Sequence, residues 1–430
     1  MLTIRDLFAY EILDSRGRPT LAVEAALSDG ARATAQVPSG ASTGSHEAVE
    51  LRDGDPSRYA GRGVAKAVLH VWTELLPAVR GLNAEDQAAV DRALIAADRT
   101  PDKSRLGANA ILGVSCAVAR AVSVSRGEPL WRTLAAGRQA MLPVPMVNVF
   151  SGGLHAGRNI EFQDFLVAPH GFDRYADALR AAVDIHAAAE RLVSEAGYAL
   201  TGVADEGGWG PALRSNEEAL EMLTRAIERA GYRPGEQVSI AIDVASSHFF
   251  RDEVYRLATE KRELTAAGMI ELLGEWCGRY PVLSIEDGLH EDDWEGWTRL
   301  TSTLGGRVQI VGDDFFTTDP RRVRRGIGEG AANAVLVKMN QIGTLTETFE
   351  VRDAARAAGW FAVVSARSGD TEDSFLADLA VACGMGQIKV GSITRSERLA
   401  KYNRLLELEA RGGLEFPGSS VFERLRGRTE

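Results

Sequence analysis

Short apolar segments alternate with helical patterns over the C-terminal two-thirds of the chain, and this alternation constrains the fold more than any other feature. A further helical pattern follows most of these segments, for example at residues 344–359. Eight strands that alternate with helices favour a (β/α)8-type barrel over an open, doubly wound sheet. Two helical patterns, at 175–197 and 215–231, both follow the second strand, so the first units deviate from strict alternation. The expected strands lie at residues 146–150, 162–168, 238–244, 281–286, 308–313, 334–339, 361–365 and 387–391.

The first part of the chain has a different pattern and predicts a smaller α+β domain. Alternating apolar segments near 3–13, 20–28 and 31–37 predict an antiparallel sheet. Helical patterns follow near residues 60–80, 85–98 and 107–126. Prolines at 143 and 145 mark the passage into the alternating region. We therefore expect domains at residues 1–136 and 137–430, since 430 residues exceed what one compact core holds.

Charge and composition exclude several classes of protein. The formal net charge of −11 predicts no nucleic-acid partner. No apolar segment approaches the roughly 18 residues that span a bilayer, and the N-terminus has Arg5 and Asp6 where a signal peptide would be apolar. The cysteines Cys116, Cys277 and Cys383 lie far apart, which is typical of free thiols in a reducing compartment. These features predict a cytoplasmic protein without a membrane partner.

Charged residues end six consecutive strands of the expected barrel. The carboxyl ends of barrel strands meet at one mouth, where catalytic residues lie. One acid at a strand end is usually a helix cap, but so many charges in succession indicate a site. In chain order these residues are Asp243, Glu286, Asp313, Lys338, Arg367 and Lys389.

The three acids of this set predict a metal site, and the three bases predict an anionic ligand. Two carboxylates about 5 Å apart repel by roughly 3 kcal/mol at an effective dielectric constant of about 20. Three converging carboxylates therefore need a divalent cation or must take up protons. Oxygen ligands without His or Cys favour Mg2+ over zinc. Opposite them, Arg367 with Ser368 can hold a phosphate-like group of a small anionic substrate.

Lysine is rare in this chain, and two of its lysines lie in apolar strand segments. Of the 49 basic residues only six are lysines, and Lys338 and Lys389 belong to AVLVKMN and QIKVGS. Burial can lower the pKa of a lysine but leaves arginine charged, so a buried lysine can act as a base. A structural ion pair is the alternative. Proton abstraction next to a metal-bound carboxylate is one chemistry that this set of charges supports.

Three loops contain further candidates, each with an ordinary structural alternative. Glu206 in ADEGGWGP is suited to protonate a leaving hydroxyl, although such an acid more often stabilises a turn. His155 in SGGLHAG lies between glycines, where a histidine is more often a surface residue. Ser42 in VPSGASTGSHEA lies in a loop that either closes over a substrate, offering a ligand to a second metal, or is a flexible connector.

A series of motifs resembles the enolase family in order and spacing over nearly the whole chain. They are EILDSRGRPT, VPSGASTGSHEA, DEGG, SIEDG with EDDW, QIVGDD, LVKMNQIGTL, RSGDTEDSFLADL and RSERLAKYNRLLELE. The resemblance implies a small N-terminal domain that caps a C-terminal barrel, a homodimer, and two Mg2+ ions in each active site. A lysine base with Mg2+ on the substrate carboxylate is the known pattern of the enolase superfamily.

By motif position the resemblance also implies a role for each candidate. The first Mg2+ would be held by Asp243, Glu286 and Asp313. Lys338 resembles the base of the family and Glu206 its acid. Lys389 resembles the residue that binds the substrate carboxylate. The remaining roles are a phosphate grip by Arg367 and Ser368, a second Mg2+ ligand in Ser42, and a closing-loop residue in His155.

The chain departs from the family pattern beside the leaving group and the phosphate. Enolases have SHRSG where this chain has SARSG, so Ala366 replaces a histidine and opens space next to Arg367. Asp164 replaces the glutamate of Q-E-F and shortens an acid beside the proton donor. Three further replacements are Arg18 for Asn, Gly288 for Pro and His248 for Glu.

These departures favour a hydro-lyase that takes a larger phosphonoformyl-type glycerate, as a carboxyphosphonoenolpyruvate synthase of phosphonate biosynthesis does. The alternative is an ordinary glycolytic enolase, which converts 2-phosphoglycerate to phosphoenolpyruvate. An acid-sugar dehydratase or racemase fits less well, because the SGASTG and DEGG loops match enolase itself. A non-catalytic binding protein fits less well too, since Asp243, Glu286, Asp313 and Lys338 would be costly buried charges without a use.

Overall fold

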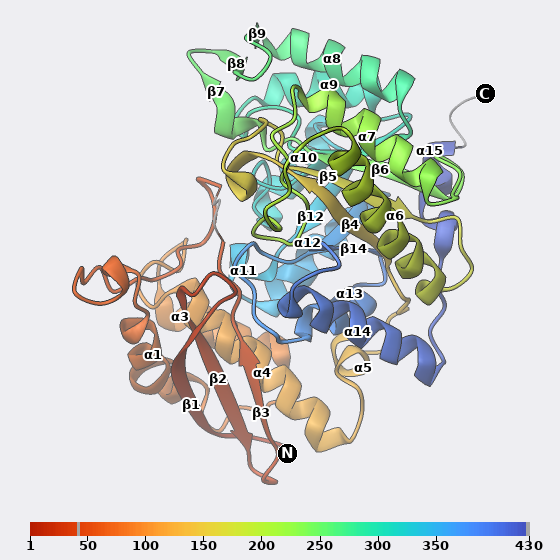
Figure 1. Ribbon diagram of the computed structural model, residues 1–430. Helices are drawn as coiled ribbons and strands as arrows, with labels where there is room; N and C mark the ends of the chain where they lie inside the picture. Colours follow the sequence, from red (N-terminus) through yellow and green to blue (C-terminus); the bar gives the residue numbers. More distant parts are fainter. Residues whose placement is uncertain (41–43, 427–430) are drawn as a thin grey trace.

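A three-stranded antiparallel sheet with helices on one face forms the N-terminal part of the protein (Figure 1). The structure is a computed structural model and describes residues 1–40 and 44–426. The first hairpin turns at Asp14, whose carboxylate accepts hydrogen bonds from the backbone N–H groups of Arg16 and Arg18. The predicted sheet is confirmed, with strands β1 (Ile4–Leu13), β2 (Pro19–Leu27) and β3 (Arg32–Gln36).

The helices of this part pack on the sheet and continue toward the barrel. The stretch predicted near 60–80 is divided into short pieces, with a π-helical segment at Val71–Leu75 between two α-helices. The 3-10 turn and helices are η1 (Tyr59–Gly61), α1 (Ala65–His70), α2 (Leu76–Val79), α3 (Gln87–Asp98), α4 (Ala108–Arg126) and α5 (Leu130–Ala135).

Eight strands form the closed barrel that the alternation predicts. The order around the barrel is β10-β11-β12-β13-β14-β4-β5-β6. Nearly every residue of these strands is buried, as expected when side chains fill the barrel on one side and pack against helices on the other. The strands are β4 (Val144–Ser151), β5 (Asp164–Pro169), β6 (Val238–Asp243), β10 (Val282–Glu286), β11 (Gln309–Gly312), β12 (Ala334–Val337), β13 (Phe361–Ser365) and β14 (Gln387–Gly391).

One strand runs against the others. β5 is antiparallel to both of its neighbours, β4 and β6, whereas the remaining pairs are parallel. The first residue of β5, Asp164, therefore pairs with Asp243, the last residue of β6. This reversal places the beginning of β5 at the same mouth as the ends of the parallel strands.

Helices surround the barrel, and several begin with a side chain that caps their first turn. Ser215, Thr265, Asp293, Asp319 and Thr344 each accept a hydrogen bond from an N–H group of the following helix. The outer helices are α6 (Tyr175–Glu195), α7 (Asn216–Arg229), α8 (Ala266–Arg279), α9 (Trp294–Leu304), α10 (Pro320–Glu329), α11 (Met339–Ile342), α12 (Leu345–Ala357), α13 (Phe375–Cys383), α14 (Ser396–Arg411) and α15 (Glu423–Arg426).

Smaller elements complete the loops. A three-stranded antiparallel sheet lies between β6 and α8 and consists of β7 (Phe250–Arg251), β8 (Val254–Leu257) and β9 (Arg262–Leu264). The 3-10 turns are η3 (Gly153–Ala156), η4 (Ser246–Phe249) and η5 (Gly418–Phe422). Of these elements, η3 carries His155 to the mouth of the barrel.

The N-terminal part docks on the barrel through polar contacts at the start of α12. The buried carboxylate of Asp91 accepts hydrogen bonds from the backbone N–H and the hydroxyl of Thr346, at 2.9 and 2.6 Å. The buried ammonium of Lys103 donates to Glu347 at 3.0 Å. Because α12 begins shortly after β12 and α11, on the side where Lys338 follows β12, this docking surface lies close to the charged mouth.

Helix α4 is long and apolar enough to cross a membrane by length and composition alone, with a mean hydropathy of 1.4 over its best window. This corrects the expectation that no segment of the chain reaches that length. In the structure 83% of the window is buried, because α4 lies between the sheet and the barrel. The cysteines are free, as predicted, with Cys116 and Cys383 buried and Cys277 half-buried.

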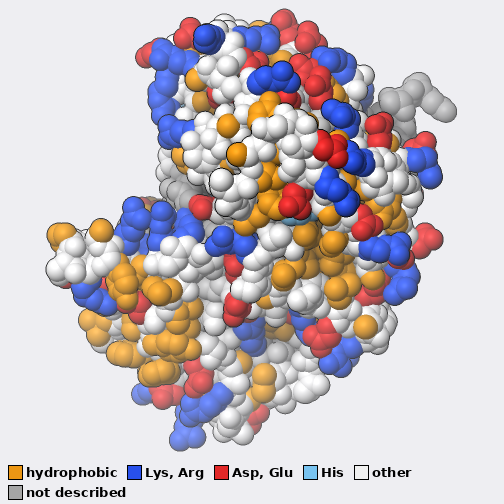
Figure 2. Space-filling view, in the orientation of Figure 1, with side chains coloured by type: hydrophobic (Ala, Val, Ile, Leu, Met, Phe, Trp, Pro, Cys, Tyr) orange, Lys and Arg blue, Asp and Glu red, His pale blue; other side chains and the backbone are white. Residues whose placement is uncertain are grey.

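The surface of the N-terminal part exposes aromatic side chains. Figure 2 shows hydrophobic atoms gathered over this part of the molecule. Phe8, Tyr10 and Trp72 are 54%, 40% and 42% exposed, and the rings of Phe8 and Tyr10 lie 5.6 Å apart. Contiguous exposed apolar groups of this kind are typical of surfaces that contact another protein.

Candidate active site

The strand-end charges predicted from the sequence do converge at one mouth. Asp243 and Glu286 are the last residues of β6 and β10, and Lys338 directly follows β12. Lys389 lies within β14, and Asp313 directly follows β11. These five residues are largely buried, so their charges depend on one another.

Lys389 lies between two of the predicted metal ligands. Its Nζ donates to Asp243 Oδ2 at 2.6 Å and to Glu286 Oε2 at 2.8 Å. Gln163, which directly precedes β5, also donates to Asp243 Oδ2, at 3.2 Å. This group brings together side chains from three different strands and the residue that precedes a fourth.

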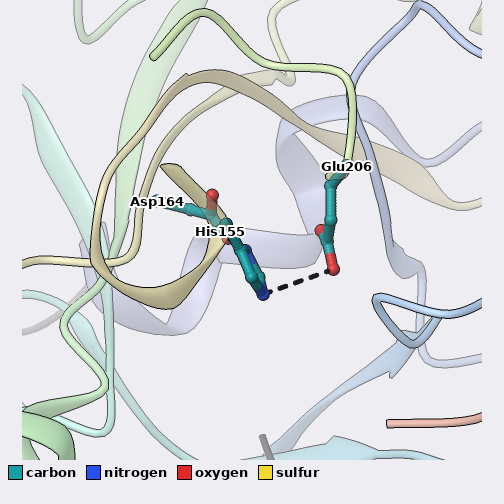
Figure 3. Close-up of side chains that lie close together, drawn as sticks. All are labelled: His155, Asp164 and Glu206. Carbon is teal, nitrogen blue, oxygen red and sulfur yellow. Dashed lines mark ion pairs between the residues drawn. The ribbon is translucent and has the colours of Figure 1, made fainter. Parts of the chain in front are cut away.

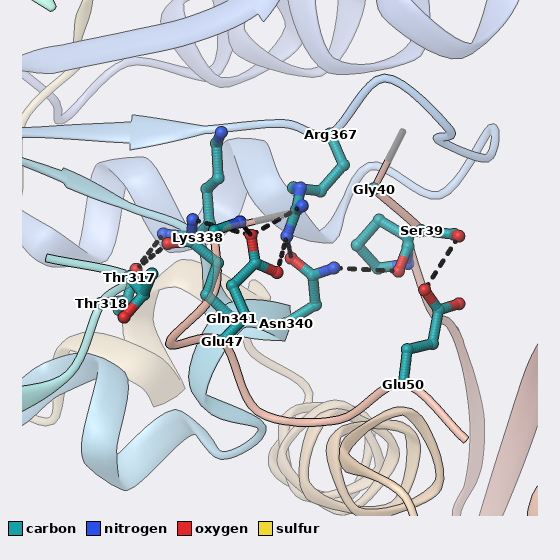
Figure 4. A network of polar contacts seen from close by, with 12 residues as sticks. Ser39, Gly40, Glu47, Glu50, Thr317, Thr318, Lys338, Asn340, Gln341 and Arg367 are labelled. Atoms are coloured by element: carbon teal, nitrogen blue, oxygen red, sulfur yellow. Dashed lines mark hydrogen bonds and ion pairs between the residues drawn. The ribbon is translucent and has the colours of Figure 1, made fainter. Parts of the chain in front are cut away.

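Lys338 forms the second cluster with Asp313. Its Nζ donates to Asp313 Oδ2 at 2.5 Å, and Gln341 Nε2 donates to Asp313 Oδ1 at 2.8 Å. Thr318 links Lys338 to Gln341. Its hydroxyl accepts a hydrogen bond from the backbone N–H of Lys338 and donates one to Gln341 Oε1. Figure 4 shows Lys338, Gln341 and Thr318 side by side in this network.

The pKa of Lys338 differs from the sequence-based expectation of a lysine with a lowered pKa. Burial alone would lower it, but the carboxylate of Asp313 more than compensates, so the pKa of Lys338 is raised. The same ion pair lowers the pKa of Asp313 despite burial. A neutral Lys338 therefore requires that Asp313 be engaged by another positive charge.

A divalent cation fits the residues present. Glu286 Oε1 is a buried carboxylate oxygen without a hydrogen-bond partner among the described residues. Burial and the nearby Asp243 raise the pKa of Glu286 well above its usual value, although the ion pair with Lys389 acts in the opposite direction, so a further positive charge would favour its ionised form. The donor set of Asp243, Glu286 and Asp313 consists of oxygen ligands, which is the preference of Mg2+.

Further acids lie behind this donor set. Oxygen atoms of Asp287, Asp313 and Asp314 lie within 4.8 Å of one another. Asp287, at a φ of +45°, accepts backbone N–H bonds from Asp313 at 2.9 Å and from Asp314 at 2.8 Å. Burial and the neighbouring carboxylates raise the pKa of Asp287 and Asp314 well above their usual values. Asp287 thus orients the turn that presents Asp313.

The acid side of the mouth is formed by Glu206, His155 and Asp164 (Figure 3). His155 lies between two carboxylates, with Nδ1 3.3 Å from Asp164 Oδ2 and Nε2 3.9 Å from Glu206 Oε1. Burial alone would lower the pKa of His155, but Asp164 and Glu206 raise it to about 9. Conversely, burial alone would raise the pKa of Glu206, but His155 brings it below its usual value. His155 is therefore the protonated member of this pair, and Glu206 the ionised one.

Asp164 is placed by the reversed strand β5 and fixed by residues of β4. Its Oδ1 accepts hydrogen bonds from Asn148 Nδ2 at 2.5 Å and from the hydroxyl of Ser151 at 3.1 Å. Its side chain is fully buried, and burial raises its pKa. One carboxylate oxygen is thereby held by β4, while the other faces His155. Asp164 orients the imidazole from the side opposite Glu206.

Arg367 is in place to bind an anion but is engaged by an acid in this structure. Its two terminal nitrogens donate to Glu47 at 2.9 and 3.1 Å, and one also donates to Asn340 Oδ1 at 3.1 Å (Figure 4). The neighbouring Ser368 hydroxyl accepts from Arg16 Nη1 at 3.3 Å. A phosphate-like group would meet Arg367 where Glu47 now lies.

The charges from both sides line one small cavity of about 20 Å³, roughly the space of one water molecule. His155, Glu206, Asp243, Lys338 and Arg367 contribute to its wall. A phosphoglycerate-sized ligand therefore requires part of the wall to move, and Glu47 to release Arg367. A larger cavity of about 410 Å³ lies between α3, α4, α5 and α12, away from these charges.

The structure brings together nearly all of the residues that the sequence predicts for the site. Ala366, Ser368, Asp164 and Lys389 line the same cavity. Ser42 lies outside the described residues. Sequence reasoning did not assign several neighbours, because it considered the charged residues at strand ends and these side chains are amides or lie elsewhere. They are Glu47, Asn148, Gln163, Asn340 and Gln341. A signal existed for four of them, since Glu47 lies in SGASTGSHEA, Gln163 in the Q-E-F motif, and Asn340 and Gln341 in LVKMNQIGTL.

Two family models match almost the whole chain. The model for the enolase N-terminal domain matches residues 4–134, and the model for the enolase C-terminal TIM barrel domain matches residues 139–422. The fold and the site thus define an enolase-type barrel enzyme. A curated relative, the enolase of Rubrobacter xylanophilus, is 53% identical over 414 residues, which cover 96% of each chain. The chain belongs to the enolase family, and its class of activity is that of a hydro-lyase.

The comparisons bear differently on the two substrates considered above. The similar curated relative carries the name enolase, which supports the ordinary reaction. Neither family model nor relative supports the preference for a phosphonoformyl-type glycerate. The ordinary enolase reaction is therefore the better-supported substrate assignment.

Proposed function

We propose that the protein converts 2-phospho-D-glycerate to phosphoenolpyruvate and water. The observation that carries this proposal is that a largely buried lysine and a buried acid, Lys338 and Glu206, line the same cavity next to three carboxylates. Elimination of water needs one group that takes the proton at C2 and another that protonates the leaving hydroxyl at C3. The mouth supplies both.

Lys338 is the base of this proposal. The C2–H bond breaks, its proton goes to Lys338 Nζ, and the electron pair forms the double bond between C2 and C3. Mg2+ ions held by Asp243, Glu286 and Asp313, with Ser42 for the second ion, would supply positive charge to the substrate carboxylate. Engagement of Asp313 in that way would release Lys338 from its ion pair and allow it to be neutral. Lys389 holds the substrate carboxylate from β14, two strands away in the barrel.

The leaving group departs on the other side of the cavity. The bond between C3 and its hydroxyl breaks, and the proton that His155 holds at rest reaches the leaving hydroxyl through Glu206 and completes the water molecule. Asp164 keeps the imidazole of His155 oriented toward Glu206. Arg367 and Ser368 bind the phosphoryl group after the ion pair between Arg367 and Glu47 has broken.

A second candidate function rests on Ala366. This residue borders the active-site cavity and also a second cavity of about 10 Å³ lined by Asn340 and Lys401. A glycerate with a larger phosphonoformyl-type group would extend past Ala366 into this space. Because each cavity holds about one water molecule, such a substrate also requires the wall to move.

The metal content, assembly and location are part of the same proposal. Family membership supports two Mg2+ ions in each site, a homodimer, and a cytoplasmic enzyme that acts on a small anionic substrate. The exposed patch of Phe8, Tyr10 and Trp72 supports contact with a second copy. The sedimentation coefficient, measured by analytical ultracentrifugation, tests whether the protein is a dimer. A value that fits a monomer at micromolar concentration contradicts the proposed homodimer.

The first experiment measures phosphoenolpyruvate formation from 2-phosphoglycerate with purified protein and Mg2+. We expect turnover that a chelator abolishes and added Mg2+ restores. The variant Ala366→His is measured beside it, because a histidine at this position narrows the phosphoryl end of the cavity. No turnover by the unmodified protein with metal bound would overturn the proposal and favour a bulkier glycerate, which Ala366→His should then exclude.

A further inference from the structure

The proposed acid Glu206 is not carried by a strand, so other contacts must hold it in place. It lies in the long connection between α6 and α7, in a loop that returns to the barrel mouth. The backbone of this loop is fixed on one side by β4, since Trp209 N–H donates to Val149 O and Ser151 N–H donates to Trp209 O, both at 2.8 Å. These contacts anchor the loop three residues beyond Glu206.

A second anchor lies directly at Glu206, in the segment that follows β14. The backbone N–H of Ser392 donates to Glu206 O at 2.8 Å. The hydroxyl of Thr394 donates to Gly207 O at 2.7 Å. Thr394 thus ties the backbone carbonyl of the residue after the acid to the segment that follows β14.

The loop with Glu206 and the segment after β14 are in close van der Waals contact at Gly207. Gly207 has a φ of +92°, which favours glycine. A Cβ atom at this position would lie 2.4 Å from Thr394 Oγ1, 2.9 Å from Thr394 O and 3.2 Å from Ser392 Cβ. The loop backbone therefore lies directly against residues 392–394, and the threonine hydroxyl sets where the peptide after Glu206 comes to rest.

We propose that Thr394 is a positioning residue for the general acid, and that its hydroxyl holds Glu206 at the distance from which it serves the leaving hydroxyl. This inference rests on the proposed dehydration. The acid and its partner His155 are 3.9 Å apart, so they have no direct hydrogen bond that would fix the carboxylate. A displacement of about 1 Å of a catalytic group can reduce a rate by about 10²-fold.

The position of Thr394 also links the two sides of the site. β14 carries Lys389, which binds Asp243 and Glu286, and the chain reaches Thr394 shortly after the strand ends. The same strand therefore positions the carboxylate-binding lysine directly and the acid through Thr394. Loss of the hydroxyl should affect only the acid, because Lys389 lies within the strand.

The test separates the two halves of the reaction. In deuterated water, NMR measures exchange of the proton at C2 of 2-phosphoglycerate, which needs Lys338 but not Glu206, beside the rate of dehydration. For Thr394→Val we expect about a tenfold lower kcat for dehydration, with KM and the C2 exchange rate within about twofold of the unmodified protein. Thr394→Ser keeps the hydroxyl and should recover most of the kcat.

A matched control is Thr301→Val. The hydroxyl of Thr301 donates to Ala331 O at 2.8 Å, in α9 and away from the mouth, so the variant loses the same kind of bond without touching the acid. We expect its kcat to be unchanged. The inference is overturned if Thr394→Val keeps full kcat, if its dehydration and C2 exchange fall together, or if Thr394→Ser does not recover. If the unmodified protein does not turn over 2-phosphoglycerate, the proposed function fails, and this inference fails with it.

Discussion

The two halves of the site are built in different ways. On the base side, Lys338 and Lys389 contact their carboxylates at 2.5 to 2.8 Å, and all of these groups are carried by strand ends. On the acid side, His155 lies 3.3 Å from Asp164 and 3.9 Å from Glu206, and the loops carry two of the three. Strand ends fix charges in direct contact, whereas the loops leave a gap in which a leaving group can be accommodated.

This contrast predicts that proton abstraction by the base side and departure of water on the acid side can be lost independently. A change on the base side should stop proton abstraction and therefore everything after it. A change on the acid side should stop only the departure of water. Changes at Lys338, Glu206, His155 and Ser151 test this separation.

Replacement of Lys338 should have the largest effect. We expect Lys338→Ala to lower dehydration of 2-phosphoglycerate by about 10⁴-fold, because general base catalysis is lost. C2 exchange in deuterated water should disappear as well. Lys261→Ala, on an exposed turn, serves as the control and should keep full activity. Exchange that persisted in Lys338→Ala would show that the base lies elsewhere.

Replacement of Glu206 should have a smaller and more selective effect. We expect Glu206→Gln to lower dehydration by about 10²- to 10³-fold, because the leaving hydroxyl is no longer protonated. C2 exchange should continue near its original rate, since Lys338 is untouched. Parallel rate measurements by absorbance and by NMR check this. If both rates fall equally, the two halves are not independent.

The histidine between the acids should make stability depend on pH. Its pKa is raised to about 9 in the folded protein, against about 6.5 in an unfolded chain, because Asp164 and Glu206 outweigh burial. The folded state therefore gains stability that is fully present below pH 6.5 and lost as pH rises to about 9. Urea unfolding of the metal-free protein should show an advantage over His155→Gln of about 3 kcal/mol at pH 6 that is gone near pH 9.5. A difference that stayed constant over this interval would contradict the ion pair.

The smallest effect concerns the support of Asp164. We expect Ser151→Ala to lower the free energy of unfolding by about 1 kcal/mol, since it removes a buried hydrogen bond to Asp164. Ser302→Ala is the control, because its hydroxyl lies on an exposed helix face and donates within its own helix. Thermal or urea unfolding of both variants decides whether the acid side is tied to β4 as the structure indicates.

The base side of the site follows from strand order alone. The ends of parallel strands meet at one mouth, so the sequence suffices to assign the charges of Asp243, Glu286 and Lys338 to one place. The acid side cannot be derived in this way. Glu206 and His155 lie in loops whose return to the mouth depends on contacts with β4 and β14, and only the resemblance to a family indicates them.

Three features of the structure cannot be read from the sequence. The segment DFLVAP of β5 has the same apolar pattern in either direction, so its reversal is not predictable from that pattern. A lowered pKa is expected for Lys338 because its apolar surroundings indicate burial, whereas its contact with Asp313 has no signature along the chain. Similarly, Glu47 reaches Arg367 across a domain boundary, and no spacing along the chain encodes that distance.

The reversed strand has a consequence for how the acid side can vary. A parallel β5 would end at the mouth. The reversed strand instead begins at the mouth, after the loop with His155, and ends at the opposite end of the barrel. The chain must then climb along α6, turn at Glu206 and descend along α7 before β6 begins. The helix pair therefore sets where the loop with Glu206 begins and ends, while contacts with β4 and with the segment after β14 set where Glu206 lies. Since each helical turn is about 5.4 Å long, insertions in α6 and α7 would shift the two ends of this loop in coarse steps, while the lysines stay where they are.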